Sequence, residues 1–292
     1  MQKGKKEQTE QCDGVCEGCP SADQMTGECK KLPEKAKIDV KHVILVISGK
    51  GGVGKSTVSV NLAYALSSNG YRVALVDLDM HGPNIPKMLG IEDEKLQAIG
   101  DKIMPIWVTG NMAVISMALL LPDRDTPIIW RGPMKMVAIR QFLEDVDWGS
   151  LDYMVVDLPP GTGDEALTIA QIAPNVRGAV VVTTPQDVAT LDARKAAHFV
   201  EKMGLKVLGI VENMSGFRCP HCNQEIDLFG TGGGRKAAEE LRVPFLGSIP
   251  IDPDMRKAGD EGRPFIIAKG NTNPTWDHVN RVMEGLVKAV EE

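Results

Sequence analysis

Two clusters of cysteines stand out in the sequence. Four cysteines lie in the first thirty residues, two more form the C-x-x-C motif of "FRCPHC", and the chain has no others. The first cluster is Cys12, Cys16, Cys19 and Cys29, and the second is Cys219 and Cys222. Cysteine is ordinarily a small hydrophobic residue that is scattered through protein cores. Its confinement to two clusters therefore favours chemistry, with thiolates as ligands of zinc or of an iron–sulfur cluster.

The C-x-x-C pair supplies only half of a tetrahedral metal site. A centre with four thiolate ligands cannot be completed by Cys219 and Cys222 of one chain, but a twofold homodimer would bring four thiolates together. Three occupants are consistent with the motif: a bridging [4Fe–4S] cluster, a bridging zinc or a thioredoxin-like redox disulfide. The redox pair fits worst, because it belongs at the start of a helix, whereas we expect a loop after "VENMSGF". His221 is expected to be a solvated loop residue rather than a ligand.

The N-terminal cysteines follow the spacing C-x₃-C-x₂-C-x₉-C. Four cysteines this close together can bind a complete cluster without a second chain. The spacing also leaves open a zinc site, and a site in which only Cys16, Cys19 and Cys29 are ligands. Residues 1–37 are polar, carry several turn formers and show no helical or strand period. We expect them to be a flexible cysteine-rich extension ahead of one domain over residues 38–292.

A phosphate-binding loop is the second chemical motif. Residues 49–56 read G-x-x-x-x-G-K-S between a strand-like run and a helix-like stretch, which is the context that the motif requires. The glycines let backbone N–H groups face the phosphates of ATP, Lys55 reaches the β- and γ-phosphates, and the Ser56 hydroxyl can bind Mg²⁺. Thr57 adds a hydroxyl at a helix N-terminus, where the dipole favours an anion. The predicted nucleotide-binding residues of this loop are Gly49, Lys50, Gly51, Gly52, Val53, Gly54, Lys55, Ser56 and Thr57.

Three aspartates follow two further strand-like runs. Asp77 and Asp79 end "VALVDLD", and Asp157 ends "YMVVD". Carboxylates at the C-terminal ends of parallel strands face the ligand crevice of a doubly wound sheet. We interpret Asp157 as the acid that holds Mg²⁺ through water, the following "PPGTGD" as a loop that senses the γ-phosphate, and Asp79 as the group that orients the attacking water. Asp77 is either a supporting acid near Mg²⁺ or a cap of the next helix.

These motifs require a sheet whose strand ends meet. Seven short apolar runs alternate with helix-length stretches: "VILVIS", "RVALVDLD", "MAVISM", "YMVVDLP", "GAVVVTT", "KVLGIVEN" and "VPFLGSIP". This pattern predicts an α/β fold with a doubly wound, mostly parallel sheet in one domain. A closing helix is expected near the C-terminus. Its buried face would be Trp276, Val279, Met283, Leu286 and Val290.

Bulk composition argues against several classes of partner. The chain has 33 basic and 39 acidic residues, a net charge of −6, so we expect neither nucleic acid nor an anionic membrane as a partner. The longest apolar runs are far shorter than the roughly 20 residues of a spanning helix. No apolar stretch follows the N-terminal lysines, as it would in a secretory signal. A chain with this much core-forming sequence needs no disulfide framework, which favours reduced thiols and a cytoplasmic location.

Lys50 is unusual within the phosphate-binding loop. From its position after the first glycine it cannot easily reach its own phosphates, but it could stabilise charge on the nucleotide of a dimer partner, as an arginine finger does in trans. "GKGGVGKST" resembles the deviant Walker A loop of the dimerising P-loop ATPases, which include the Min and Par proteins, the nitrogenase iron protein and the Mrp/Nbp35 family. We therefore predict a slow ATPase whose catalytic residues are Lys50, Lys55, Asp79 and Asp157.

Longer stretches resemble the Mrp/Nbp35 family in particular. They are "DLDMHGPNIPKMLG", "VVVTTPQDVATLDARKA" and the segment from "WRGPMKMV" to "EALTIAQ", and the resemblance covers about residues 40–290. It implies a labile [4Fe–4S] cluster that bridges two chains at Cys219 and Cys222 and is passed to apo iron–sulfur client proteins. It also implies that Asn213, Pro250 and Asp252 lie near the nucleotide base.

The N-terminal cysteines resemble those of the Nbp35 branch, which carries a ferredoxin-like cluster there, although the proportions of the spacing are reversed. The leading hypothesis is thus an ATP-dependent iron–sulfur cluster carrier. The alternative is a regulatory or positioning ATPase with a structural zinc. An electron donor like the nitrogenase iron protein fits less well, because that resemblance involves widely separated cysteines.

Overall fold

The computed structural model describes residues 33–79, 82–120, 132–219, 221–222, 224–265 and 273–292. By packing, the chain divides after Glu34, and every element below belongs to the unit Lys35–Glu292. The four N-terminal cysteines lie outside the described residues.

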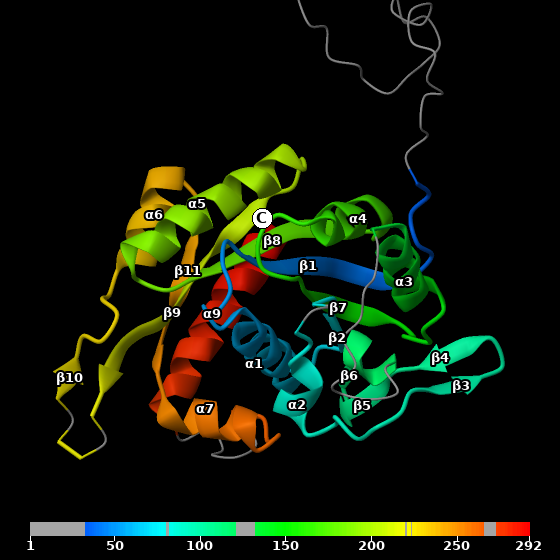
Figure 1. The fold of residues 1–292 in the computed structure, drawn as a ribbon, viewed down its shortest axis with the longest axis horizontal. Helices are drawn as coiled ribbons and strands as arrows, with labels where there is room; N and C mark the ends of the chain where they lie inside the picture. Colours follow the sequence, from blue (N-terminus) through cyan, green and yellow to red (C-terminus); the bar gives the residue numbers. More distant parts are fainter. Residues whose placement is uncertain (1–32, 80–81, 121–131, 220, 223, 266–272) are drawn as a thin grey trace, which may run out of the picture. The chain divides into compact units, whose positions relative to one another are not determined.

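Seven parallel strands form most of the central sheet (Figure 1). They are β1 (Val40–Ser48), β2 (Val73–Asp77), β6 (Met112–Ser116), β7 (Leu151–Asp157), β8 (Val176–Thr183), β9 (Val207–Arg218) and β11 (Phe245–Ile251). Strand β1 lies between β7 and β8, β2 and β6 follow β7, and β9 and β11 follow β8. These strands coincide with the seven apolar runs of the sequence, so the predicted α/β fold with a mostly parallel sheet is confirmed.

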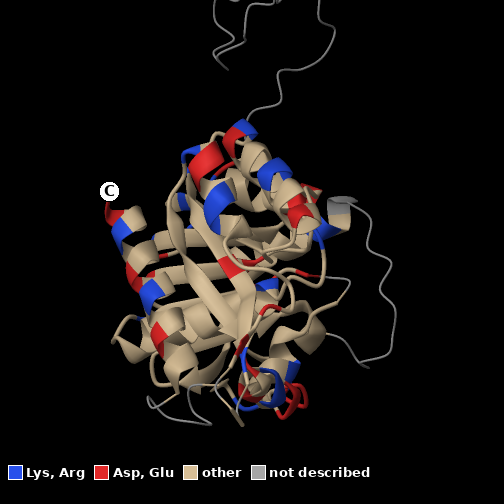
Figure 2. Cartoon of the chain, turned by 90° about the vertical axis from the view of Figure 1, so that its left-hand side faces the viewer, with Lys and Arg blue, Asp and Glu red and all other residues tan. Residues whose placement is uncertain are grey.

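The sheet is buried on both faces because its strands are apolar at successive positions. In β1, Val43, Leu45 and Ile47 pack into one hydrophobic core, and Ile44 and Val46 pack into the other. This alternation follows from the two-residue period of a strand. Figure 2 shows the corresponding distribution of charge, with charged residues mainly on helices and loops and few on the strands.

Helices cover both faces of the sheet (Figure 1). One layer holds α3 (Gly132–Glu144), α4 (Asp164–Ile172), α5 (Asp187–Lys202) and α6 (Gly233–Leu241). The other holds α1 (Lys55–Ser68), α2 (Ile85–Leu89), α7 (Pro253–Asp260) and α9 (Pro274–Glu291). The predicted apolar face of the last helix is confirmed, because Trp276, Val279, Met283, Leu286 and Val290 are all buried.

Antiparallel additions complete the sheet. Strand β5 (Ile106–Thr109) pairs with β6, β10 (Glu225–Ile226) pairs with the end of β9, and β3 (Gln97–Ile99) and β4 (Lys102–Met104) form a separate hairpin. A short 3₁₀ helix, η1 (Met117–Leu120), follows β6. The expected loop after "VENMSGF" begins one residue later, since β9 continues through this stretch to Arg218 and the described cysteines Cys219 and Cys222 lie in the turn that follows. Pairing with β10 and β11 extends the strand beyond its apolar part.

No described helix is both long enough and apolar enough to cross a bilayer.

Candidate functional site

The phosphate-binding loop links the end of β1 to the start of α1. Gly52 and Gly54 both have φ near 80°, a left-handed conformation that glycine adopts without strain. A Cβ atom on Gly49 would lie closer than 3.0 Å to the backbone of Asp192, and one on Gly54 would lie equally close to the amide of Asn213. The loop therefore needs glycine for its turn and for close packing against α5 and β9.

Lys55, at the start of α1, makes a buried ion pair. Its Nζ lies 2.7 Å from Oδ2 of Asp157, and both side chains are almost fully buried. Ser56 Oγ donates to the same Oδ2 across 2.7 Å, and Ser59 Oγ donates to Oδ1 across 2.6 Å. The predicted lysine, hydroxyl and acid are thus brought together, because β7 ends beside the first turn of α1.

Asp77 lies directly beside Asp157, since β2 and β7 pair in this register. Ser116 Oγ donates to Asp77 Oδ2 across 2.8 Å, and the backbone N–H of Asp79 donates to Oδ1 across 3.1 Å. Burial, and then repulsion from Asp157, hold the pKa of Asp77 well above its usual range. A protonated Asp77 leaves Asp157 as the charged partner of Lys55, and a bound cation would favour ionisation of both carboxyl groups.

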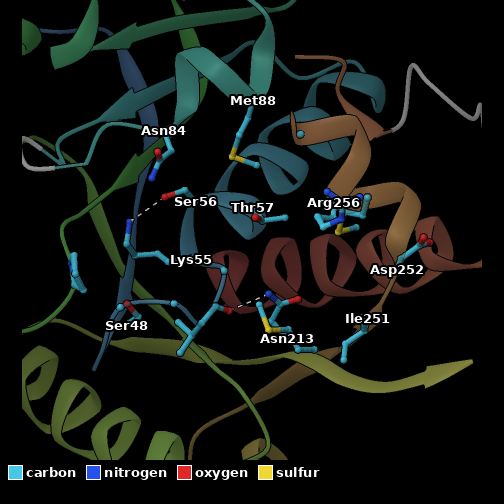
Figure 3. A pocket seen from close by; sticks show the side chains of 18 of the residues that line it. Ser48, Lys55, Ser56, Thr57, Asn84, Met88, Asn213, Ile251, Asp252 and Arg256 are labelled. Atoms are coloured by element: carbon cyan, nitrogen blue, oxygen red, sulfur yellow. Dashed lines mark hydrogen bonds between the residues drawn. The ribbon is translucent and has the colours of Figure 1, made fainter. Parts of the chain in front are cut away.

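A cleft of ≈580 Å³ lies over the loop, and most of the predicted nucleotide-binding residues line it. Figure 3 shows Asn84 and Met88 on one side of Ser56 and Thr57, and Asn213 and Ile251 on the other. Asp79 lines the cleft and is half-buried. Asp77 and Asp157 are not in the lining, because both are buried beneath it.

Lys50 also lines the cleft and is half-buried. Its carbonyl oxygen accepts a hydrogen bond from Ser48 Oγ across 3.0 Å. Within the described part of the chain, no carboxylate forms an ion pair with the Lys50 ammonium, whereas Lys55 is neutralised by Asp157. The two lysines of the loop thus have different electrostatic settings.

The far wall of the cleft holds the residues expected near the base. Asn213, on β9, donates through Nδ2 to the carbonyl oxygen of Val53 across 2.9 Å. Pro250 and Asp252 line the cleft at the end of β11 and the start of α7. Asp252 caps α7 by accepting from the backbone N–H of Asp254 across 2.8 Å, so it has a structural task at this position as well.

The thiol pair lies at the end of the β9–β10 hairpin. The backbone N–H of Cys219 donates to the carbonyl oxygen of Gln224 across 2.9 Å and closes the turn. Cys219 is half-buried and Cys222 is exposed. Backbone N–H groups of His221 and Cys222, and then the Cys222 thiol, hydrogen-bond to Cys219 and hold its pKa below the usual range. His221 is exposed, as expected.

No group of three or more histidine, cysteine or acidic side chains with metal-binding geometry occurs among the described residues. The pair at Cys219 and Cys222 is therefore not completed by other described residues of the same chain.

A sequence profile described as ParA-type, "NUBPL iron-transfer P-loop NTPase", matches residues 39–287. The chain belongs to this family. The resemblance to iron–sulfur cluster carriers in the sequence is thereby confirmed. This iron-transfer P-loop NTPase is 48% identical over 287 residues to the "Iron-sulfur cluster carrier protein" of Methanocaldococcus jannaschii, covering 96% of this chain and 98% of that protein. It is 47% identical over 261 residues to the protein of the same name in Saccharolobus solfataricus, covering 89% and 88%.

Solved structures agree with this assignment. A nucleotide-binding protein of Archaeoglobus fulgidus in complex with ADP is 38% identical to the iron-transfer P-loop NTPase, with a TM-score of 0.69 over 82% of this chain and 91% of that one. The cell-division ATPase MinD of Pyrococcus furiosus is 22% identical, with a TM-score of 0.58 over 85% and 99%. The second likeness shows the fold alone.

Some residues of the iron-transfer P-loop NTPase site were missed by the sequence reasoning. Ser59 is three residues after Ser56, on the same face of α1, and this spacing could have indicated its contact with Asp157. Ser116 is the last residue of a strand next to the one that ends at Asp77, and this position indicates its contact with Asp77 less clearly than the spacing of Ser59 indicates its own. Met88 and Arg256 line the cleft from α2 and α7, and no local pattern of the sequence pointed to them.

Proposed function

We propose that this chain is an ATP-binding and ATP-hydrolysing carrier of a [4Fe–4S] cluster. Two chains hold the cluster between their Cys219 and Cys222 thiolates and pass it to apo iron–sulfur client proteins. The observation that carries the proposal is the half-site itself. Two neighbouring thiols directly follow the strand whose residue Asn213 contacts the phosphate-binding loop, and the described residues of the same chain do not complete the site.

ATP is the proposed substrate of the cleft, with its phosphates on the backbone N–H groups of residues 49–57 and its base near Asn213, Pro250 and Asp252. The complex of the Archaeoglobus relative with ADP supports the binding of an adenine nucleotide by this chain. Oxygen atoms of Ser56 and Asp157 form a hard donor set that fits Mg²⁺, with Asp77 behind them. Ser56 would hold the ion directly and Asp157 through water, and the ion would neutralise charge on the phosphates.

Each chain's own residues have separate tasks in hydrolysis. Lys55 binds the β- and γ-phosphates and exchanges its ion pair with Asp157 for them. Asp79 orients the attacking water. Lys50, which no described carboxylate neutralises, stabilises the developing charge on the partner's nucleotide. The loop "PPGTGD" reports the γ-phosphate to the dimer contact.

An exposed apolar patch supports the homodimer. Val188 and Leu191 on α5 are 69% and 52% exposed, and Leu228 and Phe229 after β10 are 54% and 41% exposed. Gly49 packs against Asp192 on α5, and Gly230 packs against Pro185 just before it. The patch therefore borders both the phosphate-binding loop and the thiol hairpin, and apolar groups at such a site favour contact with a second copy.

Other parts of the proposal concern regions that the structure does not describe or partners that it does not contain. Residues 1–37 act as a cysteine-rich extension of the ATPase domain over residues 38–292. Cys12, Cys16, Cys19 and Cys29 hold a second cluster. The protein works in the cytoplasm, and neither nucleic acid nor a membrane is a partner.

Metal analysis of protein purified without oxygen tests the proposal. After reconstitution, the wild type should hold about one bridging cluster per dimer in addition to any N-terminal cluster. The Cys219→Ala/Cys222→Ala variant should lose the bridging iron and sulfide and should not activate an apo [4Fe–4S] enzyme. A variant with alanine at the four N-terminal cysteines is the matched control and should keep the bridging cluster.

Two results would contradict the proposal. One is full iron content and wild-type transfer by the Cys219→Ala/Cys222→Ala variant. The other is stoichiometric zinc without acid-labile sulfide in the wild type, which would favour a regulatory ATPase with a structural zinc.

A further inference from the structure

A groove opens beside Cys219, next to the nucleotide cleft. Its volume is ≈640 Å³, and its walls come from the end of β9, β10, the end of β11 and the first turns of α7 and α9. Cys219 itself is part of the lining. Anything bound in the groove is therefore adjacent to the thiol that would hold the cluster.

Acidic side chains dominate the charge of the groove. Its carboxylates are those of Glu225, Asp227, Asp252 and Asp254. Arg218 forms an ion pair with Glu225 at 2.9 Å, so these two charges cancel. Among the described lining residues, the other group that can become positive is His278, whose Nδ1 lies 2.8 Å from the carbonyl oxygen of Ser248. Asp254 makes a further interaction of its own, so the negative charge that the described lining retains is that of Asp227 and Asp252.

Between the carboxylates the lining is mainly apolar. Phe217 and Ile226 come from the β9–β10 hairpin, and Ile251, Pro253 and Pro274 come from the opposite wall. A groove of this volume and composition suits an extended peptide with long basic side chains. Their aliphatic parts would contact the apolar floor, and their charged ends would meet the carboxylates.

The groove also shares a wall with the nucleotide site. Pro250, Ile251 and Asp252 line both cavities. Because the same three residues face both, a ligand in the groove contacts the segment that closes the nucleotide cleft. The groove is therefore continuous with the machinery of the proposed function.

We infer that this groove docks an extended segment of the client protein that carries lysine or arginine side chains. The inference rests on the proposed carrier function and names the chemistry of its partner. The chain's own segments are a poorer match than a basic client segment, because acidic residues outnumber the basic ones. Its residues 1–32 hold five lysines against six acidic residues, and the whole chain has a net charge of −6, so a second copy is a poor electrostatic match.

Binding of two synthetic peptides tests the inference on the full-length, cluster-loaded dimer. Both carry a fluorescent label and a Ser-x-x-Ser sequence in place of Cys-x-x-Cys, so that docking is measured apart from cluster transfer. One has three lysines and the other has three glutamates at the same positions. Fluorescence anisotropy should show binding of the lysine peptide only, and raising the salt from about 50 mM to about 300 mM should weaken it.

Charge reversal at Asp227, which is exposed in the lining, gives the residue-level test. Asp227→Lys should weaken the lysine peptide about tenfold and Asp227→Asn by less, as expected when like charges face each other. Asp101→Lys, on the exposed β3–β4 turn, makes the same change in net charge and should have no effect. Iron content should equal that of the wild type in all three variants, which separates a failure of docking from a failure of the carrier proposal.

Three results would overturn the inference. The lysine peptide could bind no better than the glutamate peptide. Asp227→Lys could bind it as the wild type does, or Asp101→Lys could weaken it equally, which would indicate a general effect of net charge. A change of oligomeric state in Asp227→Lys, seen by sedimentation velocity, would assign the groove to a contact between copies instead.

Discussion

Lys55 is held in position before any phosphate arrives. Its ammonium is buried against Asp157, 2.7 Å away, while hydroxyls of Ser56 and Ser59 donate to the same carboxylate. A buried charge is tolerated only when it is paired and hydrogen-bonded. The arrangement therefore preorganises the lysine that we propose to bind the phosphates.

The effect of Asp157→Asn on stability follows from this pair. The neutral amide removes the nearest countercharge of the buried Lys55 ammonium, and Asp77 replaces it only in part because burial raises the pKa of that carboxyl. The free energy of unfolding of the nucleotide-free protein should therefore fall by about 3 kcal/mol. Denaturant titration measures the change. Asp101→Asn, on an exposed turn, is the control and should stay within about 0.5 kcal/mol of the wild type. Equal stability of the two variants would contradict this account of the ion pair.

Lys50→Ala should separate nucleotide binding from hydrolysis. If Lys50 acts on the partner's nucleotide, the variant keeps ADP affinity within a few-fold and loses turnover by about 10³-fold, the scale of an arginine finger. Isothermal titration with ADP and a phosphate-release assay measure the two quantities. Lys55→Ala is the comparison and should lose binding as well. Wild-type turnover in Lys50→Ala would refute the role in trans.

At the scale of elements, the phosphate-binding loop is wedged between its neighbours. Gly49 packs against the backbone of α5, and Gly54 packs against the Asn213 side chain of β9. The strand that carries Asn213 ends at the thiol hairpin. The positions of α5 and β9 therefore depend on the absence of side chains in the loop.

Gly49→Ala tests this close packing. The added Cβ would lie closer than 3.0 Å to the Asp192 backbone, so α5 must shift, and the expected cost is about 2 kcal/mol of stability. Gly51→Ala is a control within the same loop, because its Cβ would be 4.0 Å from its nearest neighbour, Pro160. Thermal unfolding of the nucleotide-free variants should show a lower midpoint for Gly49→Ala alone. Equal unfolding midpoints of the two variants would mean that α5 can shift to accommodate the Cβ atom without loss of stability.

At the scale of the whole molecule, the proposed cluster site is complete only when two chains meet. The exposed side chains of Val188 and Leu191 lie on α5, whose residue Asp192 packs against Gly49 of the loop that carries Lys50. A contact there would bring both the lysines and the thiols of two chains to one interface. ATP use and cluster binding would then depend on the same association.

Leu191→Glu tests the association. A carboxylate buried in an apolar contact should weaken the dimer by at least about tenfold, and iron at Cys219 and Cys222 should fall with it. Sedimentation equilibrium and iron analysis across a range of protein concentrations measure both effects. Ile99→Glu places the same charge on another exposed apolar site, 65% accessible, on the β3–β4 hairpin and should change neither. Wild-type dimerisation of Leu191→Glu would exclude this face as the contact.

Much of the architecture was predictable because its signals are local. Each of the seven parallel strands is a continuous apolar run, and the phosphate-binding loop lies within residues 49–57. The extension of β9 to Arg218 was not predictable, since "SGFR" has no strand pattern of its own and is ordered by pairing with β10 and β11. The contribution of Met88 and Arg256 to the lining of the nucleotide cleft was not predictable either, because it depends on where α2 and α7 pack.

The sequence by itself determined the α/β class, the phosphate-binding loop and the half-site character of the thiol pair, because these depend on residue types and spacings within short segments. Tertiary structure alone decided which distant residues meet. It placed Asn213 against Val53, 160 positions away, and it set Asp77 beside Asp157. It also built the acidic groove next to Cys219 from five separate elements. Such contacts follow from strand order and helix packing, which depend on the burial of the whole core rather than on any local pattern.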